Sequence, residues 1–137
     1  MRIIFTNGCF DILHLGHVKL LEYCHKLAYQ ALHGGQGKVV VGLNSDDSVK
    51  RLKGSDRPVN CELERMYVLE SLKYVDDVII FDEDTPYQLI KRIQPAIIVK
   101  GGDYEPQNVV GSDISEVKIF NYIEGKSTTN TIKNLKL

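Results

Sequence analysis

The feature that most constrains the fold is a regular alternation of short apolar runs with segments of helical period. Five such runs occur along the chain, at residues 2–6, 38–43, 78–81, 96–99 and 117–121. Three consecutive valines in the second run are typical of a strand covered on both faces of a parallel sheet. Because parallel strands need helical crossovers, the alternation predicts a doubly wound α/β fold with a five-stranded parallel sheet. We expect a single domain over residues 1–137.

The first helical segment begins at Gly16, directly after the first run. Its apolar residues recur at spacings of three and four: Leu20, Leu21, Cys24, Leu27, Ala28 and Ala31. This spacing predicts one apolar helical face. We interpret the glycine-rich stretch 34–37 as a flexible linker, because it precedes a strand and lies at the end of the sheet away from a ligand site.

Three later helices are predicted from the residues that begin them. Ser45 is the expected N-cap of a helix through Leu52, and Asn60 the expected N-cap of the next. The apolar side of that second helix would hold Leu63, Met66, Leu69 and Leu72. Residues 85–88 (Thr-Pro-Tyr-Gln) are typical of a capping box and predict a helix through Gln94.

Charge and composition argue against several classes of function. The chain has 17 Lys and Arg against 18 Asp and Glu, without a long run of one sign. Nucleic-acid binding normally needs a basic face, so we expect no nucleic-acid partner. No apolar stretch approaches the ~18 residues of a membrane helix. Three widely spaced cysteines without a CxxC pair favour a reducing compartment, and we expect a cytoplasmic protein.

Topology predicts where a ligand binds. In doubly wound sheets the ligand lies beyond the carboxyl ends of the strands, where the strand order reverses. We therefore expect the turns after Phe5, Leu43 and Val99, together with a helix start at Ser127, to form the site.

A pair of histidines follows the first of these turns, in the sequence His14-Leu15-Gly16-His17. Neither a GxGxxG nor a GxxxxGK[ST] phosphate loop is present there. Imidazoles three residues apart at a helix start can face the same place, where amide N–H groups and the helix dipole favour an anion. Gly16 leaves room for a phosphate, so the pattern predicts a polyphosphate site. A catalytic zinc site from Cys9, His14 and His17 is the alternative.

Residues 10–17 (Phe-Asp-Ile-Leu-His-Leu-Gly-His) resemble the signature of the HxGH cytidylyltransferase-like nucleotidyltransferases. Further matching segments follow in order at residues 44–46, 50–54, 57–60, 64–66, 99–104 and 127–130, so the resemblance covers nearly the whole chain. Within the family, the chain is most similar to the adenylyltransferases of ADP-heptose synthesis. Residues 29–38 form a longer stretch than in those relatives, and residues 111–116 a shorter one.

The resemblance implies transfer of AMP from ATP to a sugar 1-phosphate of the D-glycero-β-D-manno-heptose type, with release of pyrophosphate. It implies Mg²⁺ bound with ATP, no dedicated protein metal site and a homodimer. The implied catalytic residues are His14, His17 and Lys50. The implied nucleotide-binding residues are Thr6, Asn7, Gly8, Phe10, Gly16, Lys53, Gly101, Asp103, Ser127, Thr128 and Thr129. The implied acceptor-binding residues are Asp11, Asn44, Arg65 and Lys100.

Several of these residues also have a plain structural interpretation. Lys50 and Lys53 either neutralise phosphates or lie on a solvated helix face. Residues 127–129 either bind phosphate or only cap a last helix. The glycines at 101–102 either allow close approach of a ligand or form a turn. Asp11 either orients a group in the site or satisfies backbone donors.

Other activities compete with this interpretation. Glycerol-3-phosphate cytidylyltransferases resemble the chain but carry Arg-Thr-Glu-Gly-x-Ser-Thr-Thr, where residues 122–129 here begin with tyrosine. The missing arginine favours adenylyl transfer. An FMN adenylyltransferase is a further possibility within the same chemistry. A non-catalytic nucleotide-binding module is the alternative of another class, and the presence of both histidines argues against it.

Overall fold

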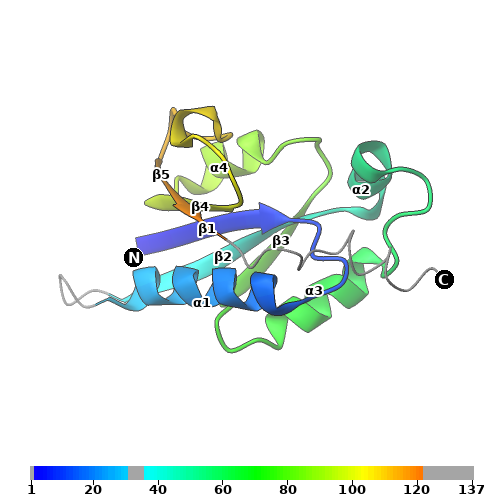
Figure 1. The fold of residues 1–137 in the computed structure, drawn as a ribbon, viewed down its shortest axis with the longest axis horizontal. Helices are drawn as coiled ribbons and strands as arrows, with labels where there is room; N and C mark the ends of the chain where they lie inside the picture. The colour runs from blue at the N-terminus through cyan, green and yellow to red at the C-terminus, as the bar shows by residue number, and fades with distance from the viewer. Residues whose placement is uncertain (1, 31–35, 122–137) are drawn as a thin grey trace.

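The computed structural model describes residues 2–30 and 36–121, which form a five-stranded parallel sheet with helices on both faces (Figure 1). The strands are β1 (Arg2–Gly8), β2 (Gly37–Asn44), β3 (Asp77–Phe81), β4 (Ile97–Gly101) and β5 (Glu116–Phe120). Their order in the sheet is β3-β2-β1-β4-β5. The predicted fold class is therefore confirmed.

The strand order reverses at β1. The chain runs outward from β1 through β2 to β3 and then returns to place β4 on the other side of β1. β1 consequently has parallel partners on both sides, with Ile4 opposite Val39 of β2 and Ile97 of β4. The crevice beyond the carboxyl ends of β1 and β4 is where such a sheet binds its ligand.

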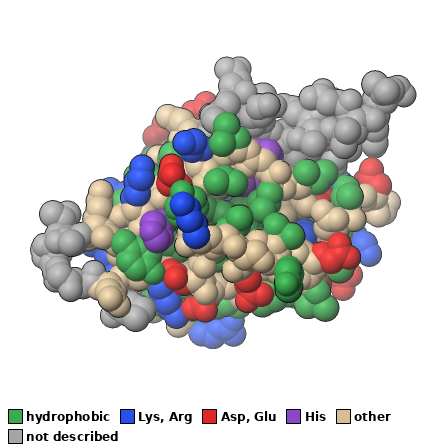
Figure 2. Space-filling view, turned by 90° about the horizontal axis from the view of Figure 1, so that it is seen from below, with side chains coloured by type: hydrophobic (Ala, Val, Ile, Leu, Met, Phe, Trp, Pro, Cys, Tyr) green, Lys and Arg blue, Asp and Glu red, His purple; other side chains and the backbone are tan. Residues whose placement is uncertain are grey.

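Helices cover both faces of the sheet. They are α1 (Leu15–Tyr29), α2 (Asp46–Lys53), α3 (Glu62–Glu70) and α4 (Tyr87–Ile93), with a 3₁₀ helix η1 at Pro106–Asn108. Figure 1 shows α1 and α3 below the sheet and α4 above it, with α2 beyond the arrowhead of β1. Seen from the α1 and α3 side, basic and acidic side chains are mixed with hydrophobic ones over the described surface (Figure 2).

Neighbouring residues of each strand pack into two separate hydrophobic cores, one on each face of the sheet. Ile4, Val39 and Val41 pack with residues of α1 and α3 on one face. Phe5 and Val40 pack with residues of α4 on the other. The valine run is therefore covered on both sides, as its composition predicts.

The structure confirms one predicted N-cap and corrects another. The Ser45 hydroxyl oxygen accepts a hydrogen bond from the Ser48 N–H at 3.1 Å. Asn60 does not cap α3, which follows Cys61. The Asn60 N–H and side-chain amide instead bind Asp11 at 2.9 Å each. On α3, Leu69 is fully buried but Leu63 is 68% exposed, so Leu63 does not share the buried side.

Two further predictions differ in detail from the structure. The helix near residue 85 begins at Tyr87, and the Thr85 hydroxyl oxygen accepts only a long bond of 3.4 Å from the Tyr87 N–H, without a capping box. Gly37 belongs to β2 rather than to a linker, because it pairs with Arg2 of β1. A Cβ at Gly37 would meet the Ala28 carbonyl oxygen at 2.5 Å. Ala31 and the helix predicted at 127–129 lie outside the described residues. Within the described ranges, no helix is long and apolar enough to cross a membrane.

Candidate active site

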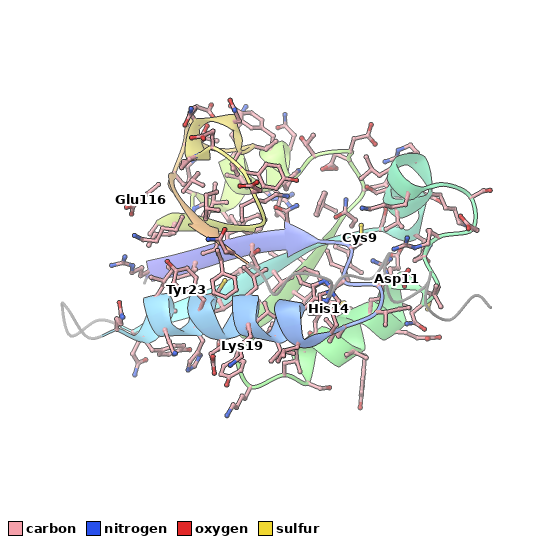
Figure 3. All side chains as sticks on the ribbon, in the orientation of Figure 1. Cys9, Asp11, His14, Lys19, Tyr23 and Glu116 are labelled. Carbon is pink, nitrogen blue, oxygen red and sulfur yellow. The ribbon has the colours of Figure 1, made fainter. Side chains whose placement is uncertain are left out.

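A cavity of about 450 Å³ lies beyond the carboxyl ends of β1, β2 and β4. Its size is in the range of small-molecule sites. It brings together ten of the residues predicted from the sequence: Asn7, Gly8, Phe10, His14, Gly16, His17, Asn44, Lys53, Lys100 and Gly101. Figure 3 shows Cys9 and Asp11 beyond the arrowhead of β1, and His14 below it at the start of α1. The topological prediction of the site is thus met by the described residues.

A left-handed residue makes the turn from β1 into this site. Phe10 has φ of 46°, an unfavourable conformation for a residue with a Cβ, and its side chain is buried. Its ring packs against the His17 ring with centroids 5.3 Å apart. Gly8 leaves room for this ring, because a Cβ at Gly8 would approach the Phe10 ring to 3.1 Å and require it to shift. Packing of Phe10 therefore fixes the turn that delivers the chain to α1.

The two histidines cap the helix that they begin. The Gly16 N–H donates to His14 Nδ1 at 3.1 Å, and the His14 N–H donates to His17 Nδ1 at 3.3 Å. The ring centroids are 3.9 Å apart. Because each Nδ1 is an acceptor, each neutral ring carries its hydrogen on Nε2. The pair thus forms a reciprocal cap in which both Nε2–H groups are donors.

His17 is held in its neutral form. Burial, with a smaller contribution from His14, lowers the pKa of His17 from 6.5 to about 4. A buried neutral donor can bind phosphate oxygen without the desolvation cost of a buried cation. The anion site also differs from the sequence prediction, since the imidazoles themselves engage the amide N–H groups of His14 and Gly16.

Asp11, a predicted acceptor-binding residue, uses its carboxylate to bind other residues of the protein. Its side chain is fully buried, and its carboxylate accepts from the N–H groups of Val59 and Asn60 at 2.7 and 2.9 Å. Arg57 Nε donates to the same carboxylate at 3.2 Å. With these donors filling the carboxylate, Asp11 ties the turn after β1 to residues 57–60. Of the two interpretations left open by the sequence, the structure supports the satisfaction of backbone donors.

Arg65 is a second predicted acceptor-binding residue whose side chain binds within the protein. It is only 2% exposed, and its guanidinium donates to the carbonyl oxygens of Cys9, Asn44 and Asn60 at 2.8 to 2.9 Å. A fourth bond joins it to the Asp46 carboxylate at 2.9 Å. Arg65 therefore holds the ends of β1 and β2 and the start of α2 together beside the cavity.

Two lysines give the cavity its positive side. Lys53 at the end of α2 and Lys100 at the end of β4 both line it. Burial and the charge of Lys53 lower the pKa of Lys100. The Lys100 ammonium lies 5.0 Å from the centre of the Tyr104 ring. The two cations repel each other, and a bound anion between them would relieve that repulsion.

Some predicted residues lie away from the cavity. Thr6 is buried inside β1, whereas Lys50 and Asp103 are exposed and do not line the cavity. Lys53, three residues after Lys50 on the same helix, does line the cavity. Ser127, Thr128 and Thr129 lie outside the described residues.

The sequence analysis missed one wall of the cavity. Asp84, Thr85 and Pro86, which follow β3, line it together with Tyr104. The signal was present, because the rule that places ligands at carboxyl ends of strands applies to β3 as well as to β1, β2 and β4. Polar residues directly after the third apolar run were therefore candidates from the start.

The zinc alternative finds no support in the described geometry. Among residues 2–30 and 36–121, no three His, Cys, Asp or Glu side chains are grouped so as to hold a metal ion. Burial raises the pKa of the Cys9 thiol, which disfavours the thiolate that zinc requires. Each histidine also has its Nδ1 occupied by a backbone N–H.

A family model described as Cytidylyltransferase-like matches residues 5–134. The chain belongs to the cytidylyltransferase-like family. This membership agrees with the resemblance carried by residues 10–17 and confirms the predicted class of enzyme, a nucleotidyltransferase. The histidine pair at the start of α1 belongs to the motif that carries the family resemblance, and both of its side chains line the cavity.

Relatives of this cytidylyltransferase-like chain include longer proteins. It is 55% identical over 136 residues to the Bifunctional protein HldE of a Nitratiruptor species, and 53% identical to that of Aliarcobacter butzleri. These matches cover 98% of this chain but only 28% and 27% of the relatives. A crystal structure of the lipopolysaccharide core biosynthesis protein from Thermoplasma volcanium superposes with a TM-score of 0.69 at 29% identity, covering 90% of this chain and 97% of that one.

Proposed function

We propose that the chain transfers AMP from ATP to D-glycero-β-D-manno-heptose 1-phosphate and releases pyrophosphate. The observation that carries the proposal is the pair of neutral imidazoles, with Nε2–H donors, in a cavity that also holds Lys53 and Lys100. Neutral donors and flexible cationic side chains together suit a substrate with several phosphates.

In this reaction an oxygen of the acceptor phosphate attacks the α-phosphorus in line. The new oxygen–phosphorus bond forms as the bond to the β-phosphate bridging oxygen breaks, and its electron pair leaves with pyrophosphate. An ionised phosphate needs no strong general base, so catalysis is positioning plus stabilisation of charge. His14 and His17 donate from Nε2 to oxygens on which charge increases in the transition state.

Lys53 and Lys100 bind different phosphates in this proposal. We assign Lys53 to the β- and γ-phosphates, because it is the cation at the end of α2 that lines the cavity. Lys100 holds the attacking phosphate near the α-phosphorus and offsets the repulsion between the two anions. Ser127, Thr128 and Thr129 stay predictions for the β- and γ-phosphates.

Mg²⁺ enters with ATP, as part of the substrate. Asp84 is the single carboxylate among the described residues that line the cavity. Such a site fits a magnesium ion that takes most of its ligands from phosphates and water rather than from a protein cage. Its chemistry there is neutralisation of the triphosphate, while the chain orients the reacting groups.

The choice of AMP and of a heptose phosphate rests on the resemblance of residues 99–104 and 122–129 to heptose-phosphate adenylyltransferases. It is supported by the high identity to two HldE proteins and by the structural relative titled a lipopolysaccharide core biosynthesis protein. We further propose that residues 1–137 act as one domain in a cytoplasmic homodimer. Because the relatives are far longer, their other activities are not assigned to this chain.

Pyrophosphate release, screened over four nucleoside triphosphates and a panel of phosphorylated acceptors, tests the proposal. We expect the fastest turnover with ATP and heptose 1-phosphate. A preference of tenfold or more for CTP with glycerol 3-phosphate would replace the proposal with the cytidylyltransferase interpretation. Preference for FMN would replace only the acceptor. Nucleotide binding without pyrophosphate from any pair would favour the non-catalytic module.

A further inference from the structure

One side of α2 holds the segment that follows β3. Ser45, Ser48 and Arg51 are spaced three residues apart and bind three consecutive residues of that segment. The Ser45 hydroxyl donates to the Asp82 carboxylate, and the Ser48 hydroxyl donates to the Glu83 carbonyl oxygen. Arg51 Nε donates to the Asp84 carboxylate. The donor–acceptor distances are 2.6, 3.0 and 2.8 Å in that order. Arg51 also donates to the Asp82 carbonyl oxygen. The position of Asp84 is therefore set by the fold.

The charge of Asp84 contrasts with the rest of the cavity. The described lining contains the cations Lys53, Arg57 and Lys100 but no other carboxylate. Within the described residues, Asp84 accepts a side-chain bond only at Oδ1, and its side chain is 63% exposed. A carboxylate repels phosphates, so in a cavity for phosphorylated substrates it binds the magnesium ion that enters with ATP or a neutral donor, and the neutral donor is the partner that we consider here. Hydroxyl groups are the donors that such substrates carry.

Position in the sheet indicates which substrate supplies those hydroxyls. The nucleotide belongs at the crevice between β1 and β4, where the strand order reverses. β3 lies on the opposite side, two strands from β1, or about 10 Å at the usual strand spacing. The segment after β3 therefore borders the part of the cavity away from this crevice and from the nucleoside that we place in it. Thr85 lies beside Asp84 and retains a hydroxyl hydrogen to donate, because its oxygen is the acceptor for the Tyr87 N–H.

We propose that Asp84 and Thr85 recognise ring hydroxyls of the acceptor sugar and so set acceptor specificity. This inference rests on the proposed transfer to a sugar phosphate. The Asp84 carboxylate accepts from hydroxyls, and the Thr85 hydroxyl donates to a hydroxyl oxygen. Lys100 holds the phosphate of the acceptor, while Asp84 and Thr85 bind its uncharged body.

Steady-state kinetics of Asp84→Ala and Thr85→Val, with ATP and the sugar phosphate varied separately, test the inference. Loss of a hydrogen bond to a charged group should raise the KM for the sugar phosphate about tenfold or more in Asp84→Ala, with a smaller rise in Thr85→Val. The KM for ATP should stay within about twofold. Acceptors lacking single ring hydroxyls should show which hydroxyl Asp84 binds, since removing it costs the wild type more than the variant.

Asp82→Ala is the matched control, because Asp82 ties the same segment to Ser45 but does not line the cavity. We expect it to lower the Tm without the rise in sugar KM. An equal rise in Asp82→Ala would mean that the position of the segment matters and not the Asp84 carboxylate, which overturns the inference. A rise confined to the KM for ATP would assign Asp84 to the ribose and overturn it as well. Failure of the wild type to use any sugar phosphate contradicts the proposed function itself, whereas an unchanged sugar KM in Asp84→Ala contradicts only this inference.

Discussion

The two sides of the cavity are built in different ways. On the α1 side, His14 and His17 are capped by backbone amides, and the Asp11 and Arg65 network behind them is buried and hydrogen-bonded. On the opposite side, Lys53 and Lys100 line the cavity, and within the described residues no carboxylate forms an ion pair with either. The first side is organised before a ligand arrives, whereas the second gains its charge partners from the ligand.

This difference predicts a division of roles. Groups that are already fixed stabilise a transition state without reorganising, so their loss should lower kcat. Lysines whose charge partners are the substrate phosphates stabilise the bound substrate as well as the transition state. Their loss should therefore raise KM. The variants below separate the two sides, in order of decreasing expected effect.

Arg65 should show the largest effect, because it supports the fixed side. Arg65→Met leaves three carbonyl oxygens and the Asp46 carboxylate without their donor in a buried place. Breaking a buried ionic network in this way costs about 3–5 kcal/mol. Thermal unfolding should show a large loss of Tm, with kcat falling in the fraction that stays folded. Arg51→Met, which removes an exposed ion pair, is the control and should cost well under half as much.

His17→Ala should lower kcat about 10²–10³-fold, as expected for the loss of one donor to developing charge. The KM for ATP should change much less, and His14→Ala should behave in the same way. His25→Ala is a control on the same helix, away from the cavity. A change confined to the KM for ATP would show that His17 acts only on the ground state, and the division between the two sides would fail.

The lysines should show smaller effects on binding. Lys53→Ala should raise the KM for ATP about tenfold, and Lys100→Ala should raise the KM for the sugar phosphate more than that for ATP. Lys50→Ala, on the same helix as Lys53 but outside the cavity, should change either constant less than twofold. Equal effects at Lys50 and Lys53 would contradict the geometry of α2.

The pH dependence of stability tests the fixed side by a measurement that does not involve substrate. The pKa of His17 is lowered from 6.5 to about 4 in the folded chain. As pH falls, His17 is therefore protonated in the unfolded chain at a higher pH than in the folded chain. The contribution of neutral His17 to stability is full above pH 6.5 and is lost as pH falls toward about 4. Between pH 7.5 and 4.5 the wild type should therefore lose more Tm than His17→Asn. Parallel curves for the two proteins would contradict a buried neutral imidazole.

The two sides also differ in how far the sequence predicts them. The sheet, its alternating helices and the histidine pair are predictable because the signals are local: valines in series, and two histidines three residues apart at a helix start. The roles of Asp11 and Arg65 depend on partners far away in the sequence, such as Arg57 for Asp11 at 46 residues and Cys9 for Arg65 at 56 residues, and no spacing rule reveals these. The sequence also could not choose between Lys50 and Lys53, because that depends on how α2 is oriented against the cavity.

The central claim is that this cavity joins AMP to the phosphate of a heptose. It is tested most directly by incubating the wild-type chain with ATP and heptose 1-phosphate whose phosphate oxygens carry ¹⁸O, followed by mass spectrometry of the products. The account predicts ADP-heptose that retains the label in its bridging oxygen, with an equal amount of unlabelled pyrophosphate. Label recovered in pyrophosphate, or release of pyrophosphate without a nucleotide sugar, would contradict it.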